Sequence, residues 1–329
     1  MNAAPGNAAI DPASITRVGT GLNRPECVLA TAGGDIYTAD WRGGVAHIGP
    51  DGTQALYRCD LPGGRPARPN AIALRPDGSF LFADLGVDRG GVFALSRDGA
   101  VRPFLETVDG IDLPPSNFVV EDALQRVWIT VSTRLVPRSL GYRRNAGDGF
   151  VVLVDRRGAR IVADGLGYTN EAILDARGEW LYVNETFARL TSRFPVRPDG
   201  SLGAREVYVE YGPGTFPDGM AFDEAGHLWV VSIVSNRVLR VAPDRSIATV
   251  VEDSDPAHLA WVEAAYVAGE LGRPQLDTAQ SRMLRNISSI AFGGADRRTA
   301  YLGCLLDDTI YAFRSPVAGL APAHWGWTA

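Results

Sequence analysis

The chain has 329 residues and a formal net charge of −6, from 38 acidic and 32 basic side chains that are spread along its length. No basic stripe is present that would predict binding to nucleic acid or to an anionic membrane. All 32 of these basic side chains are arginines, which excludes mechanisms that depend on a lysine, such as a Schiff base or a phosphate-binding P-loop.

Residues 1–14 are mostly small and polar and include two prolines, so we expect a flexible N-terminal arm. They lack the charged and apolar regions of a signal peptide, and no apolar run approaches the roughly 18 residues of a membrane span. The three cysteines, Cys27, Cys59 and Cys304, have no metal-binding spacing and are odd in number. These features predict a cytoplasmic protein with unpaired thiols.

Short strands follow one another along the rest of the chain. Residues 15–19 alternate between apolar and polar side chains, and from Pro25 onward apolar runs are separated by turns that contain glycine, such as 50–52 and 198–200. Few stretches have a helical pattern. This organisation predicts an all-β protein, either a barrel, a sandwich or a propeller.

A pair of short strands separated by a turn recurs six times. One copy runs through residues 215–223 and 227–231. Each copy has a polar residue at the start of its first strand: Glu26, Asn70, Asn117, Asn170, Asp218 and Ser289. The first five are 44 to 53 positions apart, which matches one four-stranded propeller blade of about 40–50 residues. We therefore predict a six-bladed β-propeller over residues 15–329 as a single domain, whose ring is closed by the N-terminal strand.

The longer interval between Asp218 and Ser289 predicts an insertion, residues 252–287, between the fifth and sixth blades. Asp255 and Pro256 form a helix start, and residues 257–271 predict a helix of about four turns. Its Leu259, Val262 and Tyr266 share one stripe. We expect this helix to be a lid over the channel mouth, although a contact between the subunits of a homodimer would use the same apolar surface; a monomer and a homodimer both remain open.

If the first strand of every blade is the innermost, the repeated polar residues form a ring at one mouth of the channel. Glu26, Asn117, Asn170 and Asp218 then offer two carboxylates and two amides. Oxygen ligands of this kind favour a hard divalent cation, Ca²⁺ first, with Zn²⁺, Mn²⁺ and Mg²⁺ as further candidates. The competing interpretation is that these residues only cap turns where the blades begin.

Several motifs together resemble the regucalcin/gluconolactonase family, also called the senescence marker protein family. They are Pro25-Glu26, Asn117, Thr169-Asn170, Phe216-Pro217-Asp218-Gly219-Met220 and Leu228-Trp229-Val230. The resemblance extends over residues 15–320. It implies a six-bladed propeller, a divalent ion at the channel mouth and hydrolysis of a lactone. It further implies Glu26, Asn170 and Asp218 as metal ligands, Asp218 also as the general base, and Asn117 as a further ligand or catalytic contact with substrate.

The sequence also departs from this family. Members that act on sugar lactones carry an arginine two residues before the asparagine of the third blade, where this chain has Pro115, and Gly-Leu after the asparagine of the fourth, where it has Glu171-Ala172. We therefore expect a lactone other than a typical sugar lactone. The expected substrate contacts are Trp41, Tyr168, Phe187, Phe216 and Glu171, although each aromatic ring could equally serve in packing.

Two other functions remain open at this stage. The chain is also similar to the diisopropyl-fluorophosphatase-like propellers, which implies phosphotriester hydrolysis at the same ion. A propeller that binds a partner without catalysis would need none of this chemistry, since fold alone does not define function. A serine hydrolase is not indicated because no Gly-x-Ser-x-Gly motif occurs. The predicted class is a lactonase-type carboxylic ester hydrolase.

Overall fold

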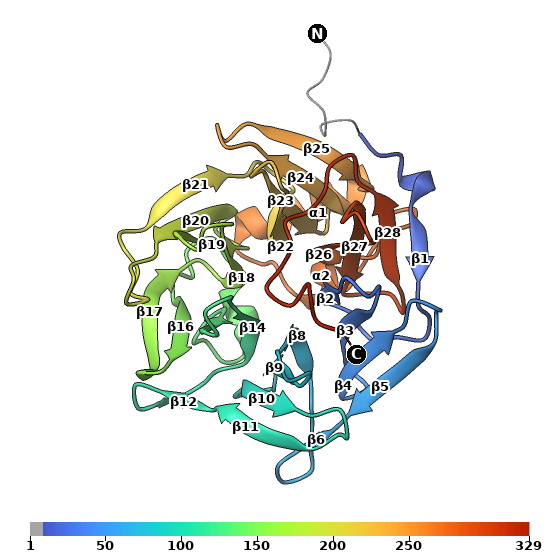
Figure 1. The fold of residues 1–329 in the computed structure, drawn as a ribbon. Coiled ribbons are helices and arrows are strands. Elements are labelled where there is room, and N and C mark those ends of the chain that lie inside the picture. Colours follow the sequence, from blue (N-terminus) through green and yellow to red (C-terminus); the bar gives the residue numbers. More distant parts are fainter. Residues whose placement is uncertain (1–8, 329) are drawn as a thin grey trace.

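The computed structural model describes residues 9–328, which form six four-stranded antiparallel sheets around a central channel (Figure 1). From the innermost strand outward, the first three blades are β2 (Val28–Ala30), β3 (Ile36–Asp40), β4 (Gly44–Ile48) and β5 (Gln54–Arg58); β8 (Pro69–Leu74), β9 (Phe80–Asp84), β10 (Gly91–Leu95) and β11 (Val101–Leu105); and β14 (Ser116–Glu121), β15 (Val127–Val131), β16 (Gly149–Asp155) and β17 (Gly158–Leu166).

The other three blades have the same order. They are β18 (Thr169–Leu174), β19 (Trp180–Glu185), β20 (Leu190–Pro195) and β21 (Glu206–Glu210); β22 (Phe216–Phe222), β23 (Leu228–Ile233), β24 (Arg237–Val241) and β25 (Ile247–Glu252); and β26 (Ile287–Gly293), β27 (Thr299–Cys304), β28 (Ile310–Arg314) and β1 (Thr16–Val18). The predicted six-bladed propeller is confirmed. The sequence did not predict two small hairpins that lie between blades. They are β6 (Asp60–Leu61) with β7 (Arg65–Pro66) and β12 (Thr107–Val108) with β13 (Ile111–Asp112).

The burial of the strands follows their position in a blade. Every residue of β9 and β10 is buried, because neighbouring blades cover both faces of these middle strands. The outermost strands β5 and β11 have no buried residue. The second strands of the third and fifth blades bury Trp128 and Trp229, whose indole nitrogens donate to the turn carboxylates of Asp122 (2.9 Å) and Asp223 (3.0 Å). The repeated hydrogen bond fixes equivalent turns in different blades.

The N-terminal strand closes the ring as predicted. β1 pairs with β28, so that Thr16 lies opposite Ala312 and Val18 opposite Ile310. Of the expected arm, residues 1–8 lie outside the described residues. The remainder is attached to the fifth blade, where the Ile10 N–H donates to Val250 O at 2.7 Å, and continues in a 3-10 turn, η1 (Pro12–Ser14).

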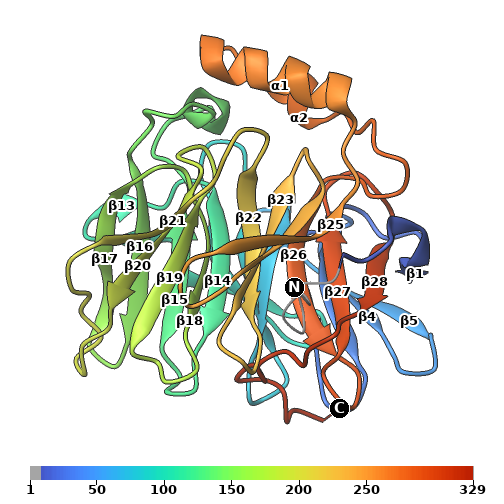
Figure 2. The ribbon, with the colours of Figure 1, turned by 90° about the horizontal axis from the view of Figure 1, so that it is seen from above.

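The insertion forms a helix over one face of the propeller (Figure 2). Helix α1 (Pro256–Ala268) begins at Asp255, whose carboxylate accepts from the His258 N–H at 2.7 Å, as the sequence predicts. It ends three residues before the predicted position because Gly269 adopts a left-handed conformation (φ 75°) and caps the last turn. Val262 and Tyr266 are buried against the propeller, while Val267 on the far side is 80% exposed. A second, short helix, α2 (Arg273–Leu276), follows.

The C-terminal segment, residues 315–328, crosses the opposite face (Figures 1 and 2). Leu320 N donates to Phe222 O (2.8 Å) in the fifth blade, and Ala32 N in the first blade donates to Trp325 O (2.9 Å). The Trp327 ring packs beneath the Arg97 guanidinium of the second blade, 4.3 Å away. This segment therefore ties three blades together at the end of the channel remote from α1.

The structure also bears on the predictions about the cysteines and about membrane spans. All three cysteines are free and buried. Among residues 9–328, none of the helices has the length and apolar character needed to cross a membrane.

Candidate active site

Irregularities in the innermost strands shape the channel mouth. In five blades, the pairing register between the first and second strands shifts at one place. The shifts lie between Pro69 and Ala71, Ser116 and Phe118, Thr169 and Ala172, Pro217 and Met220, and Ile287 and Ser289. Such a bulge releases a residue from the ladder and redirects its side chain. The residues inside the shifts include four of the predicted ring: Asn70, Asn117, Asn170 and Asp218. In the sixth blade the equivalent residue is Ser288, one position before the expected Ser289.

Hydrogen bonds link the ring residues side by side. Asn70 Nδ2 donates to Glu26 Oε1 at 2.7 Å and to the backbone oxygen of Asn117 at 3.0 Å. Asn117 Nδ2 donates to Asn170 Oδ1 at 2.7 Å, and the Asn170 side chain hydrogen-bonds to Asp218. The structure thus brings Glu26, Asn117, Asn170 and Asp218 together, with Asn70 between the first two.

The two carboxylates of the ring are buried close to each other. Burial and then the Glu26 carboxylate raise the pKa of Asp218 well above its usual value, while Arg24 and Arg138 act in the opposite direction. Arg24 Nη2 forms an ion pair with Glu26 Oε2 at 2.7 Å. Negative charge is therefore concentrated at this point of the channel and is only partly compensated by arginines.

The residues present fit a hard divalent cation. Carboxylate oxygens of Glu26 and Asp218 and amide oxygens of Asn117 and Asn170 are the ligands such ions prefer. Asn70 Oδ1 is buried at the same place without a hydrogen-bond partner. Within residues 9–328, no three His, Cys, Asp or Glu side chains gather closely enough to share an ion, so amide oxygens would have to complete the coordination.

An arginine from a loop lies against the ring. Arg138 begins the 3-10 turn η2 (Arg138–Gly141) in the long loop 132–148 between the second and third strands of the third blade. Its Nη2 donates to Asn117 Oδ1 at 3.3 Å and its Nε donates to Tyr168 Oη at 2.8 Å. No pattern in the sequence singled out Arg138.

Three predicted substrate contacts belong to an aromatic cluster beneath α1. Tyr168, Phe187 and Phe216 are at most 3% exposed, and they pack with Tyr142 and Tyr266. Ring centres are 4.7 Å apart for Tyr168 and Phe187 and 5.4 Å apart for Phe216 and Tyr266. Tyr266 Oη donates to Phe187 O at 2.5 Å. These rings therefore hold the helix over the mouth, and Tyr168 also reaches the ring residues through Arg138.

The other two predicted contacts lie elsewhere. Trp41 is half-buried beside the ring: its Nε1 donates to Pro69 O at 3.0 Å, and the Arg24 guanidinium stacks on it at 4.4 Å. Glu171 shares the bulge of Asn170 but accepts from the Met220 N–H at 2.9 Å. It lines a cavity of about 500 Å³ along the channel, which extends to the C-terminal segment. Glu171 therefore faces the interior of the channel.

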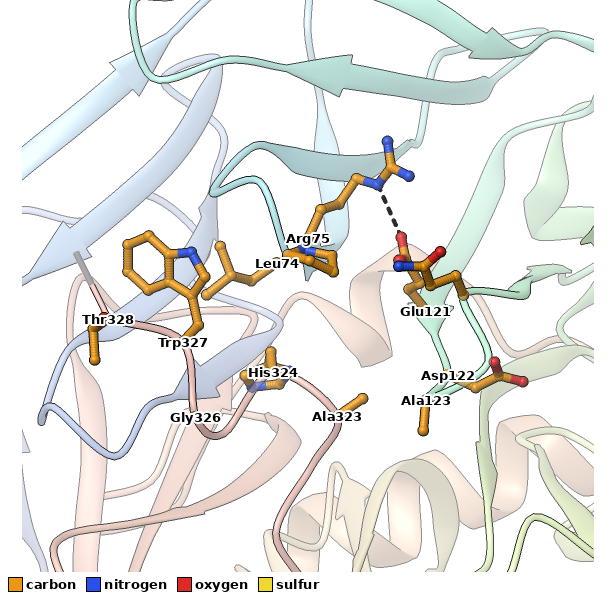
Figure 3. Close-up of a pocket in the computed structure, with 12 residues that line it drawn as sticks. Leu74, Arg75, Glu121, Asp122, Ala123, Ala323, His324, Gly326, Trp327 and Thr328 are labelled. Carbon is orange, nitrogen blue, oxygen red and sulfur yellow. Dashed lines mark hydrogen bonds and ion pairs between the residues drawn. The ribbon is translucent and has the colours of Figure 1, made fainter.

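A second cavity, of about 470 Å³, also belongs to the end of the channel remote from α1 (Figure 3). It lies between the C-terminal segment and the turns of the second and third blades, where Arg75 Nε pairs with Glu121 Oε2 at 2.9 Å. Trp327 and His324 form its other side. Neither of the two cavities coincides with the ring residues at the mouth beneath the helix.

Residues 25–262 match the protein family described as SMP-30/gluconolactonase/LRE-like region. The chain belongs to this family. The 6-deoxy-6-sulfogluconolactonase of Pseudomonas putida is 28% identical over 268 residues, which cover 76% of this chain and 78% of the relative. The pentonolactonase of Haloferax volcanii is 28% identical over 236 residues, 70% of this chain and 65% of the relative.

The fold is likewise that of solved members of the family. A structure of regucalcin from Agrobacterium tumefaciens, described as a calcium-binding protein, superposes with a TM-score of 0.64 at 15% identity, over 95% of this chain and 97% of the other. At this level of sequence identity, the structural similarity shows that the two proteins share a fold. The family predicted from the Pro-Asp-Gly-Met stretch and the ring residues is therefore confirmed.

Proposed function

We propose that this family member is a metal-dependent lactonase, a carboxylic ester hydrolase that opens a cyclic ester other than a typical sugar lactone. The observation that carries the proposal is the pair of buried carboxylates, Glu26 and Asp218, joined by Asn117 and Asn170 at the channel mouth. The lactonase names of two relatives support the reaction type. The regucalcin neighbour described as calcium-binding supports a divalent ion.

The ring residues have distinct parts in this reaction. Glu26, Asn170 and Asp218, with Asn117, would hold the ion, and their oxygen donors favour Ca²⁺. A bound divalent ion supplies Lewis-acid polarisation of the ester carbonyl and a lowered pKa of water. Asp218 accepts the proton of the attacking water. Burial and Glu26 raise the pKa of Asp218 above its usual value, which makes its carboxylate a stronger base for this step.

Removal of the ion tests this proposal. We expect dialysis against a chelator to abolish hydrolysis of γ- and δ-lactones, and Ca²⁺ to restore it, because Glu26 and Asp218 alone cannot polarise a carbonyl. Turnover is measured on a panel of lactones and aryl phosphotriesters, and thermal unfolding is followed in parallel. If chelation lowers only the unfolding temperature, the protein is a propeller that binds without catalysis. Turnover of phosphotriesters but of no lactone would make the protein a phosphotriester hydrolase and contradict the lactonase proposal.

We further propose that helix α1 is the lid of this site. The Arg189 guanidinium lies 4.3 Å from the ring centre of Phe216 and 3.8 Å from that of Tyr266, and it pairs with Glu263 of the helix. The helix is thus fastened to the fourth and fifth blades by stacking, an ion pair and the Tyr266 hydrogen bond. The apolar underside of the helix favours a substrate with apolar character.

Replacing residues 257–272 by a short Gly-Ser linker is expected to lower kcat/KM more for a large apolar lactone than for a small polar one, because only the larger substrate would extend from the ring to the underside of the helix. Both activities, metal content and molar mass by light scattering are measured for the parent and the trimmed protein. A folded, metal-loaded trimmed protein with both activities unchanged contradicts the lid. A change from dimer to monomer on trimming would assign the helix to a subunit contact.

A further inference from the structure

Arg138 is an unusual cation among the arginines at the mouth. Arg24 pairs with Glu26, Arg189 with Glu263 and Arg273 with Asp277, but Arg138 has no carboxylate within ion-pair distance among residues 9–328. Its Nε and Nη2 donate to neutral acceptors, Tyr168 Oη and Asn117 Oδ1. Its Nη1 has no protein partner in the same part of the chain. One edge of this guanidinium therefore has no hydrogen-bond acceptor among the described residues.

Arg138 lies next to the ring residues at the channel mouth. It donates to Asn117, which in turn donates to Asn170, so the guanidinium is one side chain removed from the ring ligands. Tyr142 and Tyr168, both at most 5% exposed, lie beside it, and Arg138 itself is half-buried. In a partly buried position, an interaction with a charged group gains strength relative to the same interaction at the surface.

The charges at the mouth point to the missing partner. Arg24 is paired with Glu26, whereas Arg138 has no ion pair within the described part of the chain and is balanced only by more distant groups such as Glu26. A divalent ion at the ring would add further positive charge near this guanidinium. Uncompensated buried charge is costly, so the site favours a ligand that brings negative charge.

We propose that the substrate is a lactone that carries a carboxylate substituent, and that Arg138 binds this carboxylate. This inference rests on the proposed lactonase function. A planar guanidinium matches the two oxygens of a carboxylate, which a neutral hydroxyl group cannot reproduce. Arg138 is then a specificity-determining residue that the loop between β15 and β16 supplies.

Binding of lactams tests the inference without turnover. Pyroglutamate and pyroglutaminol share one lactam ring, and they differ in a carboxylate against a hydroxymethyl group. Calorimetry with the Ca²⁺-loaded protein is expected to show at least about tenfold tighter binding of pyroglutamate, the effect of one charge-assisted hydrogen bond. Arg138→Gln is expected to remove this preference, Arg138→Lys to retain part of it, and Arg144→Gln, a control at an exposed arginine of the same loop, to retain all of it.

Kinetics separate recognition of the substituent from stabilisation of the reacting oxygen. Arg138→Gln is expected to lower kcat/KM about 10- to 100-fold on a γ-lactone that bears a carboxylate, and to change it less than about threefold on the hydroxymethyl analogue. An equal loss on both lactones would make Arg138 an oxyanion contact and overturn the inference, as would equal binding of the two lactams by the parent protein.

These outcomes also separate the inference from the proposed function. Lactone hydrolysis without a preference for the carboxylate contradicts the inference and leaves the lactonase proposal intact. A preference for pyroglutamate that depends on Arg138, without hydrolysis of either lactone, contradicts the lactonase proposal and supports an anion site at the mouth. If Arg138→Gln does not fold, the lactam preference of the parent protein and of Arg138→Lys decides the question.

Discussion

Asp218→Asn is expected to lower kcat on lactones by about 10² to 10⁴ while the propeller remains folded. The amide has nearly the same shape as the carboxylate, but it cannot accept the proton of the attacking water. It also provides less charge to hold an ion, so any loss of metal would add to the effect. Because the substitution removes a buried negative charge beside Glu26, we expect the metal-free protein to unfold at the same temperature or a higher one.

The measurement is kcat at saturating Ca²⁺, with metal content and thermal unfolding determined on the same preparation. Asp51→Asn is the matched control, since Asp51 is exposed in a turn of the first blade and only holds Thr53. Near-normal turnover by a folded, metal-loaded Asp218→Asn protein would remove Asp218 from the catalytic role.

The fold could be predicted because the same local rules operate six times. A polar residue, a short strand, a glycine-containing turn and a second strand recur at blade spacing, and repetition makes each copy support the others. The pairing of β1 with β28 followed from the same count, since the last blade lacked a fourth strand in sequence order. Clustering of Glu26, Asn117, Asn170 and Asp218 was predictable because equivalent positions of a propeller meet at the channel.

Features that depend on tertiary contacts were not predictable. The bulge in β26 places Ser288, and not the predicted Ser289, at the position equivalent to the ring residues of the other blades. Register shifts of this kind leave no clear pattern in the sequence. The orientation of Glu171 was not predictable either: its neighbour Asn170 in the bulge turns towards the mouth, while Glu171 itself accepts from the Met220 N–H. The position of Arg138 depends on how a 17-residue loop, 132–148, folds over the ring, which periodicity does not determine.

Gly219→Ala is expected to disturb both stability and activity, because the glycine follows Asp218 at a crowded contact between blades. A Cβ atom there would lie 2.5 Å from Ser288 O and 2.5 Å from Ser289 Cα, both in the backbone of the sixth blade, and 2.9 Å from Glu171 Oε1. Backbone atoms of a packed sheet cannot move aside cheaply, so we expect a loss of about 1–3 kcal/mol in the free energy of unfolding.

The same substitution displaces the strand that carries Asp218. A shift of about 1 Å in a catalytic group can cost about 100-fold in rate, so kcat/KM of Gly219→Ala is expected to fall by at least that factor. Gly212→Ala is the matched control, because no atom lies within 4 Å of the Cβ that it adds. Denaturant unfolding and lactone kinetics are compared for the two variants. If both behave like the parent protein, close packing of the fifth blade against the sixth is not what requires glycine in the Pro-Asp-Gly-Met stretch.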